Sequence, residues 1–188
     1  MNKIIIPYYS KSGHTKRLAE AVLSGVRDIT DQSFILNVEQ TGDPEWKLLE
    51  KADGIIFGSP TYMGSVAGPY KVFLEETAFR GLWTGQKFAD KMAGGFTIAT
   101  YPSGDKLSTL MQLSIFAAQH GMIWVNNKGT GAKVTGRAKD YNHCGAWLGL
   151  MANSSPDKSK LISDDDFQFA SMFGKRFAKA VQRWNRDA

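Results

Sequence analysis

The feature that most constrains this chain is a regular alternation between short apolar runs and longer segments with helical spacing. Strand-like runs occupy residues 3–9, 33–38, 53–58, 94–100 and 122–125. Apolar positions recur with helical spacing in residues 18–26, 44–51, 69–77, 106–119 and 170–184, and Ser163 can cap the last of these segments. Strands that alternate with helices need crossover connections, which place the strands parallel. The sequence therefore predicts a single domain, residues 1–188, with a doubly wound α/β fold and helices on both faces of a parallel sheet.

Composition and charge exclude several classes of protein. The chain has 188 residues with 43% hydrophobic content, enough for one substantial core. Its net charge of +5 is dispersed, so we expect no nucleic-acid partner. Cys144 is the only cysteine, which excludes an internal disulfide and a multi-cysteine metal site, and we expect no metal. The N-terminal apolar run is short and interrupted by Pro7, so we expect no membrane insertion and a cytoplasmic protein.

The first predicted strand ends in the segment "YYSKSGHT" at residues 8–15. In parallel sheets ligands bind beyond the carboxyl ends of the strands, so the loops at these ends are the candidate sites. Ser10, Ser12 and Thr15 offer hydroxyl groups, and Gly13 allows backbone N–H groups to turn inward before a helix. Neither the Walker A pattern nor G-x-G-x-x-G occurs here. The segment predicts a phosphate-binding loop; an ordinary helix start capped by Ser12 or Thr15 is the alternative.

Two further loops follow the third and fourth predicted strands. Residues 59–68, "SPTYMGSVAG", present the flat and polarizable side chains of Tyr62 and Met63. Residues 100–106, "TYPSGDK", present Tyr101, and Asp105 can cap the next helix. For residues 59–68, a loop that packs its own aromatic residues is the alternative interpretation. Together the three loops fit a ligand with a monophosphate, a polyol and a flat ring, which is flavin mononucleotide (FMN).

With these motifs the chain resembles the flavodoxin-like superfamily and, within it, the WrbA-type NAD(P)H:quinone oxidoreductases, relatives of the NADPH-dependent FMN reductases. The resemblance is carried by "YYSKSGHT" at 8–15, "GSPTYMGSVAG" at 58–68, "GLW" at 81–83 and "QHGM" at 119–122. It implies a flavodoxin-like, five-stranded parallel sheet of order 2-1-3-4-5 and non-covalently bound FMN. It also implies two-electron reduction of a quinone-like small molecule by NADH or NADPH, with both bound in turn at one site in a ping-pong mechanism.

The resemblance also implies roles for individual residues. The first loop would hold the phosphate, the second would border the isoalloxazine, and the third would cover the pyrimidine side and the ribityl chain. The residues predicted to bind FMN are Ser10, Lys11, Ser12, Gly13, His14, Thr15, Pro60, Thr61, Tyr62, Met63, Gly64, Thr100, Tyr101, Pro102, Ser103, Gly104 and Asp105. Trp83 and His120 are the predicted catalytic residues: Trp83 as an apolar wall, and His120 to orient the acceptor oxygen or supply a proton. The alternatives are an interface or core tryptophan and a helix-terminal histidine.

Two departures from the family pattern concern assembly and the central strand. An insertion that contributes to tetramer packing in the family is missing between residues 37 and 53, and we expect a homodimer or homotetramer. Pro7 falls in the expected central strand, where it removes a ladder donor, so a local bulge or a lost hydrogen bond is expected. Residues 141–151 are apolar enough to form a final strand segment at the sheet edge.

Other functions share much of this pattern. A flavodoxin-type electron carrier that docks on redox proteins has the same fold and cofactor, although such carriers are typically strongly acidic and this chain is not. A reductase of flavins or azo compounds would differ only in its acceptor, and an adaptor protein would have lost the ligand. Four basic residues either attract the phosphate of the nicotinamide cofactor or belong to a solvated loop: Lys128, Lys133, Arg137 and Lys139.

Overall fold

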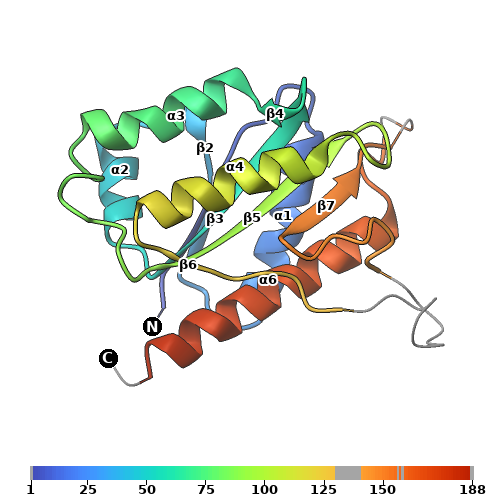
Figure 1. Cartoon of the computed structure of the whole chain (residues 1–188). Helices are drawn as coiled ribbons and strands as arrows, with labels where there is room; N and C mark the ends of the chain where they lie inside the picture. The colour runs from blue at the N-terminus through green and yellow to red at the C-terminus, as the bar shows by residue number, and fades with distance from the viewer. Residues whose placement is uncertain (1, 130–140, 156, 158, 187–188) are drawn as a thin grey trace.

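The structure, a computed structural model, describes residues 2–129, 141–155, 157 and 159–186. Its sheet contains, in spatial order, β2 (Ser33–Asn37), β1 (Ile4–Tyr8), β3 (Gly54–Tyr62), β5 (Met92–Ala99) and β6 (Ile123–Trp124) (Figure 1). All neighbours along this path are parallel. The predicted doubly wound parallel sheet is confirmed. When these five strands alone are numbered in chain order, their spatial order is the predicted 2-1-3-4-5.

Two short strands extend this sheet beyond the five that were predicted. β4 (Ser65–Val66) pairs antiparallel with the end of β3, and β7 (Leu150–Asn153) pairs parallel with the end of β5. Because β6 pairs with the start of β5, at Met92, the fifth position in the sheet is shared by β6 and β7. The strand segment expected within residues 141–151 therefore exists, but it begins only at Leu150 and continues to Asn153.

The helices cover both faces of the sheet, as the alternating pattern predicts. α1 (His14–Arg27) and α6 (Asp164–Trp184) share one core cluster with β1, whereas α2 (Asp43–Glu50), α3 (Gly68–Phe79) and α4 (Lys106–Gln119) share the other (Figure 1). The 3₁₀-helix η1 (Val38–Gln40) follows β2. Ser163 caps α6 as predicted, because its side chain accepts a hydrogen bond from the Asp166 N–H at 3.0 Å.

The structure explains the proline in the central strand. β1 and β3 pair at Ile4, Ile5 and Tyr8, but the register is interrupted around Pro7. The Gly58 N–H donates to the Tyr70 hydroxyl, and that hydroxyl donates to the Pro7 carbonyl, each at 3.0 Å. A fully buried tyrosine therefore bridges the two strands where the proline lacks its own N–H. The hydrogen bond of the missing Pro7 N–H is lost as expected, while the Pro7 carbonyl and the Gly58 N–H stay paired through the tyrosine side chain.

Among the described residues, no helix combines the length and the apolar character needed to cross a bilayer. Within the same residues, no group of three or more His, Cys, Asp or Glu side chains is arranged to hold a metal ion. The cytoplasmic location remains a prediction.

Candidate functional site

The first loop connects β1 to α1 through a left-handed glycine. Gly13 has φ of +92°, a conformation that favours glycine, and its N–H donates to the Ser10 hydroxyl at 3.1 Å. Ser12 Oγ lies 2.9 Å from His14 Nδ1, and no side chain caps α1. The interpretation of this loop as a helix start capped by Ser12 or Thr15 is therefore wrong. The first amides of α1 keep their capacity to bind an anion, as a phosphate requires.

A cavity of about 170 Å³ brings residues from all three predicted loops together at the carboxyl ends of the strands. Its lining from the predicted set consists of Ser12, His14, Thr15, Pro60, Thr61, Tyr62 and Thr100. The meeting of the three loops supports one shared ligand site rather than three loops that pack independently. Lys11 is exposed beside this cavity without lining it.

The second loop differs from its predicted form because it is mostly a β-hairpin. β3 continues to Tyr62, and Thr61 and Tyr62 pair with Val66 and Ser65 of β4. The tip of the hairpin consists of Met63 and Gly64, which have positive φ values of 50° and 74°. The Met63 side chain is fully exposed and Tyr62 is 42% exposed, so both offer surface at the mouth of the site. The hairpin holds these side chains more rigidly than an open loop would.

The Thr61 side chain is held by hydrogen bonds within the protein. Its hydroxyl lies 2.8 Å from the hydroxyl groups of both Thr97 and Thr109 in the protein interior. These two partners belong to β5 and α4, so Thr61 ties β3 to both elements. Two of the three hydrogen-bonding positions of this hydroxyl are therefore occupied within the protein.

The third loop separates two cavities. Thr100 faces the 170 Å³ cavity, where its Oγ1 accepts a hydrogen bond from Ser154 at 3.3 Å. Pro102, Ser103 and Asp105 line another cavity, of about 850 Å³, along α4. Tyr101 is 75% exposed, and Gly104 turns the chain with a φ of +53°.

Asp105 does not cap α4 through its side chain, so that prediction is wrong. Its backbone is left-handed, with φ of +51°, whereas capping side chains usually project from an extended N-cap residue. The contacts of Asp105 and of the rest of the third loop with FMN remain predictions. The outer position of Pro102, Ser103 and Asp105 makes Thr100 the third-loop residue placed best to touch the ligand.

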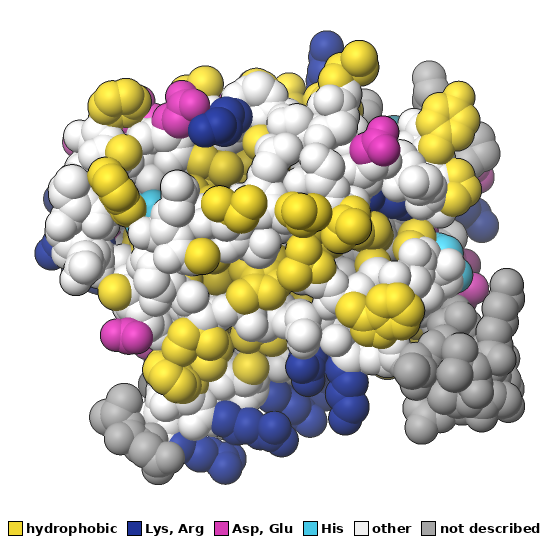
Figure 2. All heavy atoms as spheres, viewed as in Figure 1, with side chains coloured by type: hydrophobic (Ala, Val, Ile, Leu, Met, Phe, Trp, Pro, Cys, Tyr) yellow, Lys and Arg dark blue, Asp and Glu magenta, His cyan; other side chains and the backbone are white. Residues whose placement is uncertain are grey.

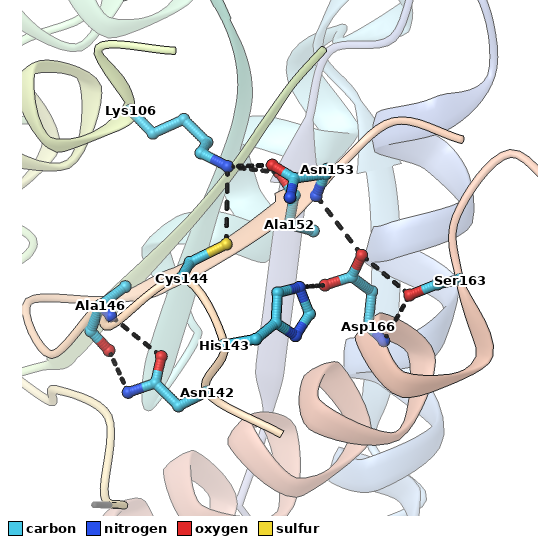
Figure 3. A network of polar contacts seen from close by, with 9 residues as sticks. All are labelled: Lys106, Asn142, His143, Cys144, Ala146, Ala152, Asn153, Ser163 and Asp166. Carbon is cyan, nitrogen blue, oxygen red and sulfur yellow. Dashed lines mark hydrogen bonds and ion pairs between the residues drawn. The ribbon is translucent and has the colours of Figure 1, made fainter. Parts of the chain in front are cut away.

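A buried lysine anchors the end of the third loop (Figure 3). Lys106 begins α4 with no exposed surface, and its Nζ donates to the Ala152 carbonyl at 3.1 Å and to the Asn153 side chain. The same Nζ lies 3.6 Å from Cys144 Sγ. Three segments distant in sequence thus meet at one ammonium group. This arrangement fixes the start of α4 against the end of β7, next to Ser154 in the candidate site.

Figure 3 also shows an ion pair beside this lysine. His143 Nε2 lies 3.3 Å from Asp166 Oδ1, and Asp166 Oδ2 accepts a hydrogen bond from Ser163. A hydrogen bond with the Cys144 side chain and the charge of Asp166 raise the pKa of His143, against the opposing effect of burial. These contacts join the segment before β7 to α6 and support a structural role for His143.

The structure places Trp83 and His120 close to each other but far from the phosphate loop. Both line a cavity of about 450 Å³ between α3 and α4, and the Trp83 indole N–H donates to the Gln119 carbonyl at 3.0 Å. α4 spans fourteen residues, roughly 20 Å, away from the third loop. Its end lies near the start of β5, because the Asp90 N–H donates to the Gly121 carbonyl. Within one chain these two residues and the loops predicted to bind FMN therefore occupy opposite ends of β5.

His120 is itself held by a specific set of neighbours. Its Nε2 lies 3.0 Å from the Thr77 hydroxyl, and its ring packs against Phe88 and Phe116 with centroid separations of 5.1 and 4.6 Å. Burial lowers its pKa. The helix-terminal alternative explains its position at the C-cap of α4, but its side chain turns to Thr77 rather than to the last carbonyls.

Sequence reasoning missed Ser154, which lines the 170 Å³ cavity. It follows β7 at the carboxyl end of the sheet, and the apolar run followed by "NSS" was the signal that could have identified it. Of the basic residues considered for nicotinamide binding, Lys128 lines a groove along α6, away from the candidate site. Lys133, Arg137 and Lys139 lie outside the described residues.

Comparisons with known proteins agree with this geometry. The family model described as "NADPH-dependent FMN reductase" matches residues 46–133. "Flavodoxin FldP" of Pseudomonas aeruginosa is 34% identical, over 97% of this chain and 98% of that protein. An "NAD(P)H dehydrogenase (quinone)" of Geobacter sulfurreducens is 30% identical, over 97% of this chain and 98% of that protein.

Among solved structures, a flavodoxin described as a WrbA-like protein, from Agrobacterium tumefaciens, superposes with a TM-score of 0.77 at 30% identity. The superposition covers 97% of this chain and 99% of that one. Similarity over nearly the whole chain, together with the loops that meet at the carboxyl ends of the strands, confirms the resemblance found in the sequence. The chain belongs to the flavodoxin-like, WrbA-type family of FMN-dependent oxidoreductases.

Proposed function

We propose that this protein binds FMN at the carboxyl ends of its strands and reduces quinone-like small molecules with NADH or NADPH by a ping-pong mechanism. The observation that carries this proposal is the cavity in which residues of all three predicted loops meet. The uncapped start of α1 beside it offers amide donors to a phosphate. FMN would supply the redox chemistry, taking electrons from the nicotinamide and passing them to the acceptor.

The residues of this chain would position the cofactor and exclude water. Gly13 and the first turn of α1 would hold the phosphate, and Thr100 and Ser154 lie where hydroxyl groups of a polyol can be bound. The exposed side chains of Tyr62 and Met63 on the hairpin and of Tyr101 on the third loop would border the flat ring. The three exposed side chains are costly to leave in water, and a planar ligand would cover them.

The positions of Trp83 and His120 favour a site completed by a second copy of the chain. These two residues are too far from the phosphate loop to reach a ligand bound there by the same chain. Figure 2 shows hydrophobic side chains gathered over α4, where Leu107, Met111 and Ile115 are each about half exposed. Such a continuous apolar surface is typical of an interface. We therefore propose a homodimer as the minimum active unit, in which each copy presents Trp83 and His120 to the ring of its partner.

An anaerobic titration tests the proposed activity. Protein reconstituted with FMN should lose its oxidised flavin spectrum on addition of stoichiometric NADPH or NADH and recover it when benzoquinone is added. A Ser12→Asp variant should lose FMN, because the new carboxylate repels the phosphate, whereas Ser12→Asn should retain it. Ser12 is exposed, so both variants should fold. Equal FMN retention by the two variants would contradict the proposed phosphate site.

The second candidate function is a flavodoxin-type electron carrier, which the 34% identity to a protein named flavodoxin favours. The same titration distinguishes the two functions. A carrier keeps its flavin oxidised in the presence of NADH and NADPH and becomes reduced only when a redox protein delivers electrons. A reductase is reduced directly by at least one of the two nicotinamides.

A further inference from the structure

The second half of α6 presents a positively charged face to solvent. Residues 171–186, which cover this half and the two residues after it, contain no Asp or Glu. Figure 2 shows basic side chains gathered along this part of the helix, at the lower edge of the view. Arg176, Lys179 and Arg183 are separated by three and four residues, so they lie on one side of α6. This side concentrates positive charge that no acidic residue of the same stretch offsets.

The charged side of α6 borders a groove of about 380 Å³. Asn127 and Lys128, which follow β6, line the same groove, and the buried rings of Phe169 and Phe173 contribute apolar atoms to it. Pockets for small molecules have volumes of roughly 300–1,000 Å³. The groove is therefore large enough to receive a small ligand, and basic side chains reach it from two separate segments.

The segment that carries Lys128 is fixed on both sides. Asn127 is buried, and its N–H donates to the Trp147 carbonyl at 2.9 Å. The Trp147 indole N–H in turn donates to the Gly129 carbonyl at 2.9 Å. Because the residues before and after Lys128 are both held by Trp147, this wall of the groove is formed before any ligand arrives.

Most of the positive charge around the groove has no counter-charge. Lys175 pairs with Asp28 at 2.9 Å, and the Arg176 Nε donates to the neutral Asn126 carbonyl at 2.8 Å. Three basic side chains at the groove make no ion pair or side-chain hydrogen bond within the described part of the chain: Lys128, Lys179 and Arg183. Like charges around one groove repel each other, and a bound anion would remove this repulsion.

Phosphate groups match this arrangement of cations. A guanidinium group binds two phosphate oxygens at once, and an ammonium group binds phosphate as a point charge. Arg176, Lys179 and Arg183 follow each other at about one helical turn, roughly 5 Å along the axis. A chain of linked phosphates can therefore contact several of these side chains together, whereas a single phosphate leaves most of the charge uncompensated. A flat membrane surface would reach the rim of the groove but not its interior.

We propose that this groove is a binding site for a polyphosphate, with Lys128, Lys179 and Arg183 in contact with the phosphate oxygens. The ligand is either an inorganic chain or the phosphate part of a nucleotide, because the groups that recognise both are the same. The groove shares no lining residue with the cavity where the three loops meet. The site is thus separate from the proposed FMN site and does not rest on the proposed function.

Calorimetric titration of the full chain tests this site, with excess FMN present so that the phosphate loop is filled. Tripolyphosphate should bind one equivalent, at least about tenfold more tightly than inorganic phosphate, because it makes additional charge-assisted hydrogen bonds. Added salt should weaken this binding. Tighter binding of ATP than of tripolyphosphate would identify a nucleotide ligand, and equal binding would identify the inorganic chain. Tripolyphosphate that binds no better than phosphate would overturn the proposal.

A pair of charge-matched variants shows whether the groove itself is responsible. The double variant Lys179→Gln and Arg183→Gln removes two exposed cations from the groove and should weaken tripolyphosphate binding at least about tenfold. The control, Lys47→Gln with Lys51→Gln, removes the same charge from exposed positions at α2 and should bind as the unmodified protein does. Equal weakening in both variants would attribute binding to the overall charge and overturn the proposal. Neither result depends on the flavin titration that tests the proposed function.

Discussion

At the scale of single residues, the Tyr70 hydroxyl takes the place of a β-ladder bond between Pro7 and Gly58. Both of its hydrogen bonds are 3.0 Å long and fully buried. Tyr70→Phe leaves the Gly58 N–H and the Pro7 carbonyl without this bridge, so we expect the free energy of unfolding to fall by about 1–3 kcal/mol. Urea unfolding measures this change. Tyr101→Phe, at a 75% exposed position, is the matched control and should change stability by less than about 0.5 kcal/mol.

The two buried or half-buried histidines should titrate on opposite sides of the ordinary value. Burial lowers the pKa of His120, whereas the hydrogen bond with Cys144 and the charge of Asp166 raise that of His143. An NMR titration of the ring protons should therefore show His120 protonating below about pH 6.5 and His143 above it. Identical titration curves for the two rings would contradict this assignment.

The same shifts predict opposite contributions to stability. The folded protein binds the His120 proton less tightly than the unfolded chain, so this residue lowers stability as the pH falls below about 6.5. His143 binds its proton more tightly when folded, so its contribution is complete below about pH 6.5 and is lost as the pH rises through its folded pKa. Replacing His143 by Gln should therefore reduce stability at pH 6 more than at pH 8.

At the scale of elements, α1 and α6 approach each other through two glycines. A Cβ atom on Gly25 would lie 1.7 Å from the Ser171 carbonyl oxygen, and one on Gly174 would lie 2.0 Å from that of Val22. Backbone atoms cannot move aside as a flexible side chain can, so the helices must separate. Gly174→Ala should lower the free energy of unfolding by about 3 kcal/mol or more.

The control for this prediction lies on the other face of the sheet. Gly68 begins α3, and a Cβ atom there would have no neighbour within 4 Å. Gly68→Ala should leave stability unchanged or raise it by up to about 1 kcal/mol, because alanine favours the helix. Equal losses in the two variants would show that helix propensity, rather than the close approach of α1 and α6, dominates at these positions.

The helices and strands that were predicted well are those whose own residues show a clear apolar periodicity. The apolar periodicity located α4 at residues 106–119 and placed the main parallel strands. The hairpin at Met63 and Gly64 was missed because it depends on pairing between β3 and β4, and that pairing is not visible in either strand alone. Asp105 was predicted to cap α4 because aspartate is favoured at helix N-caps. Its left-handed backbone cannot be recognised from the residue type.

In the candidate site, too, some residues were predicted correctly from a general rule and others were missed. The rule that ligands bind at the carboxyl ends of parallel strands was sufficient to bring Ser12, Pro60 and Thr100 to one cavity. Ser154 was not predicted because it reaches the cavity through β7, which pairs with β5 but follows β6 only much later in the sequence. Trp83 and His120 were grouped with the flavin by motif alone, whereas the direction of α4 carries them to the other end of the sheet.

At the scale of the whole molecule, this separation leads to a prediction about assembly. If the active site combines the phosphate loop of one copy with Trp83 and His120 of another, two inactive variants should complement each other. Ser12→Asp chains lack FMN but carry an intact His120, whereas His120→Gln chains bind FMN but lack the histidine. In a mixed dimer, one of the two sites receives FMN from the second variant and His120 from the first, so that site is complete.

Co-expression of the two variants with different affinity tags isolates such mixed dimers. Their NADPH:benzoquinone activity, measured per bound FMN, should exceed that of His120→Gln alone and approach that of the unmodified protein. His120→Gln chains carrying both tags control for purification and should stay at the low level. If His120 acted on the flavin of its own chain, no mixed dimer would contain a complete site and the activity would not recover. Because α4 separates His120 from the first loop within one chain, recovery of activity requires contact between copies. Failure to recover activity would show that each chain functions alone.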